Sequence, residues 1–279
     1  MIKKLIGAVA ALLLLLAALP VSHAGATGSG ESVQLPILMY HHMSVDSRYW
    51  SDYVVPPETL EGDLKYLQEH GYQTVSAQLL QLWCLGEAEL PEKPVMITFD
   101  DGQLSFAEYA VPLLEQYGMC AVMNIVGKYA DIYTETADEN IYYAHMSWPK
   151  LTQIDDLPCV ELGAHTYNMH DLKERRGCGK MNGETNGDYN LALNSDLEKL
   201  EGLFDDYLGY VPDVFAYPYG IYNDEALSVL RARGYNVIFT CDQHVNTLTG
   251  DSAELLSLGR FNRSNKLDRA KLFTAMGIN

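Results

Sequence analysis

Basic residues are scarce in this sequence of 279 residues. Lysine and arginine together number 19 against 37 aspartates and glutamates, which gives a net charge of −18 and an isoelectric point near 4.7. A chain of this charge repels a polyanion, so binding to DNA or RNA is excluded as a function. The 48% apolar content is enough for one sizeable core and argues against intrinsic disorder.

Several patterns are also missing. No segment repeats at a fixed period, which excludes a solenoid, and no G-x-G-x-x-G follows a strand-like run, which argues against a dinucleotide cofactor. The five cysteines are an odd number and show neither a C-x-x-C nor a cysteine-rich metal spacing. We interpret them as structural or incidental, except Cys178, whose loop Gly177-Cys178-Gly179 is expected to be exposed.

The one long apolar run lies at the N-terminus. Two lysines precede an apolar stretch over residues 5–19, and small residues follow it. This pattern is typical of a secretory signal peptide, with cleavage after Ala24 or Ala26. An uncleaved membrane anchor is the alternative, although the run is shorter than the ~20 residues of a spanning helix. We predict a signal peptide over 1–26, a linker over 27–34, a secreted or cell-surface location, and no membrane span in the mature form.

Strand-like runs alternate with amphipathic helices through the rest of the chain. Three predicted helices end at Gly71, Gly118 and Gly234, each shortly before a strand-like run. Glycine closes a helix readily in the left-handed conformation, so these joints predict αβ units and a parallel sheet. A fourth helix is predicted to begin at the capping-box pattern Ser195-Asp196-Leu197-Glu198. The candidate strands are 35–40, 73–75, 94–99, 119–126, 160–165, 213–217, 236–241 and 256–260.

Seven or eight such units predict an α/β fold, a deformed (β/α) barrel of seven or so strands, in a single domain over 35–279. A barrel fits this number of units in about 250 residues better than an open doubly wound sheet. Because the functional groups of such barrels lie at the C-terminal ends of the strands, those ends are the places to look for chemistry.

Two adjacent carboxylates, Asp100 and Asp101, follow the predicted strand 94–99. If buried, each opposes the ionisation of the other, unless a cation or a shared proton relieves the repulsion. The alternative is a solvated turn, because Asp-Gly is a common turn former. The pair therefore indicates a metal only if further ligands lie nearby.

His165 and His170 come at the end of the predicted strand 160–165 and just beyond it. Imidazoles five positions apart cannot share a helix face, but a strand end leading into a tight loop can bring both to one point. Together with Asp101 they form a two-histidine, one-carboxylate set with open positions for water. This set favours a metal site over unliganded side chains.

These motifs and their flanks resemble those of a known family. Thr98-Phe99-Asp100-Asp101-Gly102 resembles the first motif of the polysaccharide deacetylases, also called NodB-homology domains or carbohydrate esterase family 4. His165-Thr166-x-x-x-His170 resembles the second, in the longer-spaced form of the poly-N-acetylglucosamine deacetylases of biofilm matrix. The run 215–220 is similar to the third motif, and 36–42 resembles the opening strand of that branch. The resemblance extends in matching order from Pro36 to Arg263.

The chain also departs from the family pattern. Many members carry an arginine ahead of the Pro-Tyr of the third motif, where this chain has Ala216, so the group that orients the base is not apparent there. The stretch 256–263 lacks the C-terminal Leu-x-x-x-His motif. In the biofilm branch the acid histidine comes instead from the Tyr-His of the opening strand, which matches His41. His42 points to the other side of an extended chain and is expected to be structural.

The resemblance implies one divalent metal ion, zinc or another divalent transition metal, held by Asp101, His165 and His170. It implies that the metal activates a water to attack an amide carbonyl, that Asp100 acts as the base, and that His41 acts as the acid for the departing amine. The backbone N–H of Tyr219 would help to stabilise the oxyanion. The implied function is an exported hydrolase that removes N-acetyl groups from an N-acetylglucosamine polysaccharide.

Four questions stay open at this stage. A non-catalytic polysaccharide- or cell-wall-binding module is the alternative class, and a peptidoglycan sugar or a small N-acyl compound is the alternative substrate. The polar, glycine-rich stretch 171–183 is either a substrate-facing loop or an ordinary solvated insertion. Seven tyrosines near predicted strand ends can stack on sugar faces or simply pack in the core and rim: Tyr129, Tyr133, Tyr142, Tyr143, Tyr167, Tyr217 and Tyr219.

Overall fold

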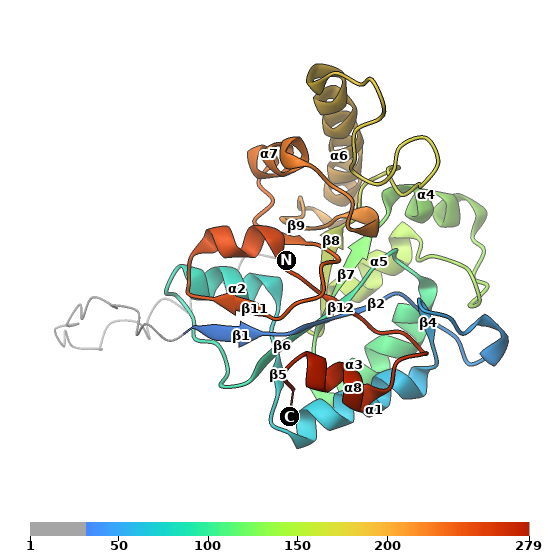
Figure 1. Cartoon of the computed structure of the whole chain (residues 1–279). Helices are drawn as coiled ribbons and strands as arrows, with labels where there is room; N and C mark the ends of the chain where they lie inside the picture. The colour runs from blue at the N-terminus through green and yellow to red at the C-terminus, as the bar shows by residue number, and fades with distance from the viewer. Residues whose placement is uncertain (1–31, 279) are drawn as a thin grey trace, which may run out of the picture.

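A curled sheet of parallel strands forms the centre of the molecule (Figure 1). The computed structural model describes residues 32–278, so the predicted signal peptide and most of the predicted linker lie outside the described residues. Seven strands follow the order β10-β9-β8-β7-β6-β2-β12, β5 pairs with the start of β6, and every pair is parallel. This architecture confirms the predicted deformed (β/α) barrel.

The strands are β1 (Val33–Leu35), β2 (Ile37–Tyr40), β3 (His42–Met43), β4 (Val54–Val55), β5 (Gln73–Thr74), β6 (Pro94–Phe99), β7 (Ala121–Ile125), β8 (Val160–Ala164), β9 (Val214–Ala216), β10 (Val237–Phe239), β11 (Asn246–Leu248) and β12 (Phe261–Asn262). The helices are α1 (Pro57–Glu69), α2 (Ala77–Cys84), α3 (Val111–Tyr117), α4 (Gly127–Thr136), α5 (Trp148–Asp155), α6 (Asn186–Leu208), α7 (Asp224–Arg233) and α8 (Arg269–Ala275). Four short helical turns are η1 (Ser47–Tyr49), η2 (Phe106–Ala110), η3 (Pro218–Gly220) and η4 (Ser252–Ser257).

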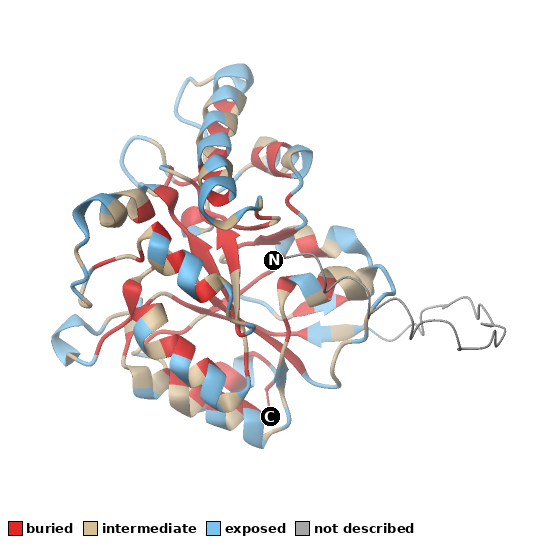
Figure 2. Ribbon diagram, turned by 180° about the vertical axis from the view of Figure 1, so that it is seen from behind, coloured by how far each residue is buried: buried red, intermediate tan, exposed pale blue. Residues whose placement is uncertain are grey.

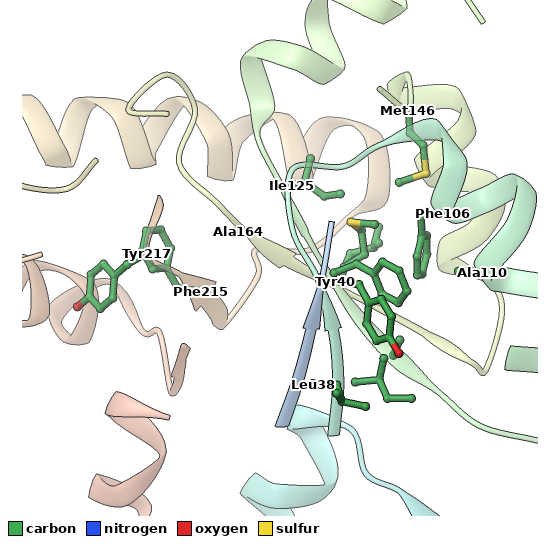
Figure 3. Packing of buried hydrophobic residues seen from close by; sticks show 14 of the residues in the cluster. Leu38, Tyr40, Phe106, Ala110, Ile125, Met146, Ala164, Phe215 and Tyr217 are labelled. Carbon is green, nitrogen blue, oxygen red and sulfur yellow. The ribbon is translucent and has the colours of Figure 1, made fainter. Parts of the chain in front are cut away.

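Both faces of the sheet are buried, as expected for parallel strands covered by helices. Figure 2 shows buried strands behind helices whose outer sides are exposed. Successive side chains of β6 alternate between two apolar clusters: Ile97 and Phe99 pack with the helices, and Met96 packs on the other face. Figure 3 shows part of the helix-facing cluster, including Tyr40 and Phe106. In the same cluster the Phe99 ring contacts the Tyr40 and Phe106 rings, with centroids 5.0 and 4.8 Å away. The same alternation places Thr98 and Asp100 on the Met96 face.

The segment before β12 joins the two ends of the curled sheet. Leu258 forms a parallel bridge with Phe239 of β10, and β12 then pairs with β2. The predicted strand 256–260 is therefore wrong in position. The reason is that Asp251 caps η4 by accepting a hydrogen bond from the Ala253 N–H, so the apolar residues up to Ser257 are helical.

The glycine joints confirm the predicted αβ units, but one helix begins earlier than predicted. Gly71, Gly118 and Gly234 all have positive φ, between 62° and 94°. The helix expected to begin at Ser195 is α6, and its cap is Thr185, which accepts a hydrogen bond from the Asp188 N–H. The buried face of α6 already starts at Tyr189, so the capping-box pattern at 195 lies inside a continuous helix.

The N-terminal boundary also differs from the prediction. Val33 and Gln34, placed in the linker by the sequence, belong to β1, which pairs antiparallel with β11. Strand β11 is not among the predicted strands, because a three-residue strand carries too short a pattern to recognise. Within residues 32–278, no helix has the length and apolar character needed to span a membrane.

Candidate active site

Asp101 occupies a strained turn directly after β6. Its φ is 75°, in the left-handed region that residues with a Cβ seldom adopt, and Gly102 has the same φ. The turn is held by hydrogen bonds from the Leu104 N–H to the Ala144 carbonyl and from the Met146 N–H to the Gly102 carbonyl, each 2.8 Å. Strain of this kind persists where the surroundings enforce it, and it is common at functional sites.

The loop after β8 carries both candidate histidines and is anchored by α6. Thr166 also has a positive φ, 66°, and the Asp196 carboxylate accepts hydrogen bonds from the N–H groups of Tyr167 and Asn168, both at 2.7 Å. Asp196, predicted as part of a helix cap, instead holds this loop from within α6. As a result His165 and His170 converge, as the sequence predicted.

Asp101, His165 and His170 meet at one point. Asp101 Oδ1 lies 3.0 Å from His170 Nε2 and 3.6 Å from His165 Nε2, and one ligand atom from each residue lies within 4.8 Å of the others. Asp101 Oδ1 is buried and, among the described residues, has no hydrogen-bond partner of good geometry. A buried carboxylate oxygen without a partner is costly unless a cation binds it, so the donor set fits a divalent ion.

The second nitrogen of each histidine is also engaged. His165 Nδ1 lies 2.7 Å from the Ala216 carbonyl, which can only accept, so Nδ1 carries the proton and Nε2 is free to bind a metal. His170 Nδ1 lies 3.1 Å from the Tyr219 hydroxyl, which can accept from Nδ1–H in the same way. Ala216, which lacks the family's arginine side chain, thus contributes its backbone carbonyl to the site.

Charge and burial set the protonation states of His165 and Asp101. Burial lowers the pKa of His165 to about 4, so its imidazole is neutral at pH 7, the form that binds metals. Burial acts to raise the pKa of Asp101, but contact with His170 and the charges of His41 and His165 outweigh it and hold that pKa well below its usual range. Asp101 is therefore a carboxylate at neutral pH.

Asp100 is oriented by an arginine from the segment that joins the two ends of the sheet. Arg260, fully buried, donates from its two terminal nitrogens to the two Asp100 oxygens at 2.8 Å each. Asn124 Nδ2 donates to Asp100 Oδ1, also at 2.8 Å. Burial acts to raise the pKa of Asp100, but the Arg260 charge and hydrogen bonds outweigh it and hold the pKa well below its usual range. Asp100 stays ionised, and its orientation is fixed.

Arg260 was not predicted from the sequence. It is the group that orients the base, which Ala216 left unidentified. The arginine lies in the segment that joins the sheet ends, where its Nε donates to the Thr240 carbonyl at 3.0 Å. A single arginine in the mostly apolar run 255–261 is a signal of a buried, paired charge. Its partner is not predictable locally, because Asp100 is distant in the sequence.

His41 and His42 have different surroundings, as the alternation of side chains along an extended chain predicts. His42 is buried, and its Nδ1 lies 2.9 Å from Ser105 Oγ, which also accepts from the Met43 N–H. His41 directly follows β2, which pairs with β6, the strand that leads into Asp100 and Asp101. Its Nδ1 is buried without a partner among the described residues, and its ring contacts the Tyr53 ring edge-on at 5.0 Å.

Tyr219 lies in η3, which follows β9. Its φ is 59°, so three of the four non-glycine residues with positive φ in residues 32–278 surround this site. Burial raises the pKa of Tyr219 to about 12, which keeps its hydroxyl protonated beside His170. The Tyr219 ring lies against the His170 ring, with centroids 4.5 Å apart.

The stretch 171–183 packs against this same turn. The Cys178 N–H donates to the Ile221 carbonyl at 3.0 Å, and the Tyr189 hydroxyl donates to the Cys178 carbonyl at 2.6 Å. Cys178 is buried, so the expectation of an exposed thiol is wrong. The flanking glycine explains this, because a Cβ on Gly177 would lie only 2.5 Å from the Pro218 oxygen. All five cysteines lie in the described residues and are free thiols.

Comparison with known proteins points to one family. A family model described as polysaccharide deacetylase matches residues 87–238. The poly-beta-1,6-N-acetyl-D-glucosamine N-deacetylase of Escherichia coli (strain K12) is 29% identical over 220 residues, which cover 71% of this chain and 32% of that protein. The chain thus spans about a third of that relative's length. The enzyme of the same name from Staphylococcus aureus (strain MRSA252) is 24% identical, over 72% of this chain and 66% of that protein.

A solved structure shares the fold. A de-N-acetylase from Aggregatibacter actinomycetemcomitans superposes with a TM-score of 0.73 at 21% identity, covering 87% of this chain and 99% of that one.

Proposed function

The chain belongs to the polysaccharide deacetylase family, and we propose that it hydrolyses the N-acetyl groups of an N-acetylglucosamine polysaccharide, releasing acetate and leaving free amines. The observation that carries the proposal is the convergence of Asp101, His165 and His170 beside the oriented carboxylate of Asp100. The non-catalytic alternative is disfavoured because a binding module has no need of a buried, strained carboxylate beside two histidines.

Asp101, His165 and His170 are the proposed ligands of one divalent ion, with zinc as the first choice. Such an ion, when bound, supplies a Lewis acid that polarises a carbonyl and lowers the pKa of water. Asp100 is the proposed base, because it is ionised and Arg260 fixes its carboxylate. Its Oδ2 accepts only from Arg260 among the described residues, so this oxygen retains a lone pair for a proton.

His41 is the proposed acid, and the Tyr219 backbone N–H is the proposed oxyanion donor. His41 follows β2 and Asp100 follows the neighbouring strand β6, so the proposed acid and the proposed base come from adjacent strands. This arrangement suits amide hydrolysis, in which one group takes a proton from the nucleophile while another delivers a proton to the leaving nitrogen.

Poly-β-1,6-N-acetylglucosamine is the proposed substrate, because relatives named for this activity match most of the described chain. Such a polymer lies outside the cell, which agrees with the predicted signal peptide. We therefore propose that the protein is exported, with residues 35–279 acting as one deacetylase domain.

Acetate release tests the proposed function. Zinc-loaded protein is expected to release acetate from β-1,6-linked N-acetylglucosamine oligomers in preference to chitin oligomers or peptidoglycan. Asp101→Ala is expected to lose both the bound metal, measured by elemental analysis, and acetate release, because two imidazoles alone leave an incomplete ligand set. Metal-loaded wild-type protein that releases acetate from none of the three would contradict the proposal, and unchanged metal content in Asp101→Ala would contradict the ligand set.

The role of His41 is tested by comparing leaving groups. An amide nitrogen must be protonated to depart, whereas the phenolate of an activated aryl ester needs no proton. His41→Gln, which preserves hydrogen bonding but does not titrate, is expected to lose roughly 10²-fold or more in amide kcat/KM and far less with the ester. Equal losses of kcat/KM on both substrates would assign His41 a binding or structural role. Unchanged amide hydrolysis would show that another group acts as the acid.

A further inference from the structure

Exposed aromatic side chains gather in the loop between β3 and β4. Among the described residues, fourteen large apolar side chains are exposed, and four of them fall within residues 45–53. Tyr49 is 44% exposed, Trp50 39% and Tyr53 58%. Scattered exposed apolar residues need no explanation, but a concentration of rings in one loop marks a contact surface.

The rings are held in place by the loop's own hydrogen bonds. Trp50 Nε1 donates to the Ser44 carbonyl at 2.8 Å, and the Ser51 N–H donates to the Val54 carbonyl at 3.0 Å. The Tyr49 ring stacks on Tyr142 with centroids 5.1 Å apart and planes 18° apart. We call Tyr49, Trp50, Tyr53 and Tyr142 the aromatic shelf. Because the shelf is ordered in advance, a ligand that stacks on it pays little ordering entropy.

The shelf adjoins the candidate active site. The Tyr53 ring contacts the His41 ring edge-on, and the His42 N–H donates to the Tyr53 carbonyl at 3.1 Å. Tyr142 belongs to the loop after α4, which also supplies His145; that histidine contacts Gln103 beside Asp101, at 2.9 Å between side-chain nitrogens. Figure 1 shows the loops after β3 and after α4 on the same side of the molecule. An elongated ligand that binds to the shelf can therefore also reach the candidate active site.

We propose that the aromatic shelf binds the sugar rings that flank the unit being deacetylated, an inference that rests on the proposed function. A pyranose presents an apolar C–H face and a polar rim, which match an aromatic ring bearing a hydroxyl or N–H. The net charge of −18 disfavours anionic partners such as acidic phospholipids. A neutral N-acetylated glycan, or one made cationic by partial deacetylation, is not repelled. The shelf therefore makes the enzyme prefer oligomers to single sugars.

The ratio of kcat/KM for an N-acetylglucosamine pentamer to that for the monomer tests this inference. Trp50→Ala and Tyr49→Ala are each expected to lower the ratio by about 5- to 10-fold, in line with the free energy of single aromatic contacts. Trp50→Phe, which keeps a ring, is expected to restore most of the ratio. Leu85→Ala is the control, because Leu85 is an exposed apolar side chain that lines a hollow with Pro94, at the other end of β6 from the site. The ratio for this variant is expected to match wild type.

The possible outcomes distinguish failure of the proposed sugar binding by the aromatic shelf from failure of the proposed deacetylase function. An unchanged ratio in Trp50→Ala, with acetate still released, overturns the shelf alone. Loss of binding to phosphatidylcholine–phosphatidylglycerol vesicles in that variant, with the ratio unchanged, would assign the surface to a membrane instead. If wild-type protein releases no acetate from any oligomer, the proposed function fails. Calorimetric binding of the pentamer to wild type and to Trp50→Ala then decides the shelf independently, since equal affinities overturn it.

Discussion

Asp100→Asn is expected to lower kcat for amide hydrolysis by roughly 10²–10⁴-fold while the protein keeps its metal. The substitution preserves the shape of the side chain but removes its ability to accept a proton. Asp100 is not among the three converging ligands, so elemental analysis is expected to find the wild-type metal content. Acetate release measured at saturating substrate, on samples of equal metal content, gives the rate comparison.

The same chemical change far from the site provides the control. Glu161 lies near the start of β8, where its half-buried carboxylate accepts hydrogen bonds from the N–H groups of Ala77 and Gln78 at the start of α2. Glu161→Gln is expected to leave kcat unchanged, because this carboxylate does not face the candidate ligands. Near-normal acetate release by metal-loaded Asp100→Asn would remove Asp100 from the role of base.

The strand ends explain why most of the site could be predicted from the sequence. Asp100 and Asp101 directly follow an apolar run, and His165 ends another, so a parallel sheet brings them to one edge. The apolar run and the polar residues after it are local features. Each can be read without knowing how the barrel closes.

Other features depend on contacts between distant segments and could not be predicted in this way. Cys178 was expected to be exposed because it lies between two glycines in a loop, yet Gly177 lets the loop pack closely against the turn at Pro218. The start of α6 was misplaced because two capping patterns occur in one long helical stretch, and only packing of Tyr189 shows which one begins the helix. Local propensity ranks such alternatives weakly, and tertiary contacts decide between them.

The Arg260–Asp100 pair is the clearest case. Neither residue carries a local signal for the other, and the segment with Arg260 was predicted in a different register, as strand 256–260. The contact arises only because Leu258 bridges to β10 and β12 pairs with β2, which carries the arginine across the closing edge of the sheet. A charge pair that depends on barrel closure links the stability of the fold to the geometry of the base.

Arg260→Met is therefore expected to destabilise the protein by roughly 3–5 kcal/mol, because it leaves the buried Asp100 carboxylate without its counter-charge. Arg260→Lys is expected to cost less stability but still to lower kcat, because a single ammonium cannot make the two parallel hydrogen bonds that orient Asp100. Denaturant unfolding of samples with equal metal content gives the stability, and acetate release gives kcat.

A double variant distinguishes loss of the ion pair from loss of arginine packing. If the cost of Arg260→Met comes from an unpaired carboxylate, adding Asp100→Asn removes that charge, and the double variant is expected to recover part of the lost stability.

The pH dependence of the free energy of unfolding also has a defined sign. In wild type the depressed pKa of Asp100 gives stability that is present above the ordinary carboxyl pKa and lost as the pH falls through the folded-state value. Without Arg260, burial favours the protonated acid, so Arg260→Met is expected to lose stability as the pH rises from 5 to 8. Equal destabilisation at both pH values, with no recovery in the double variant, would show that Arg260 acts through packing alone.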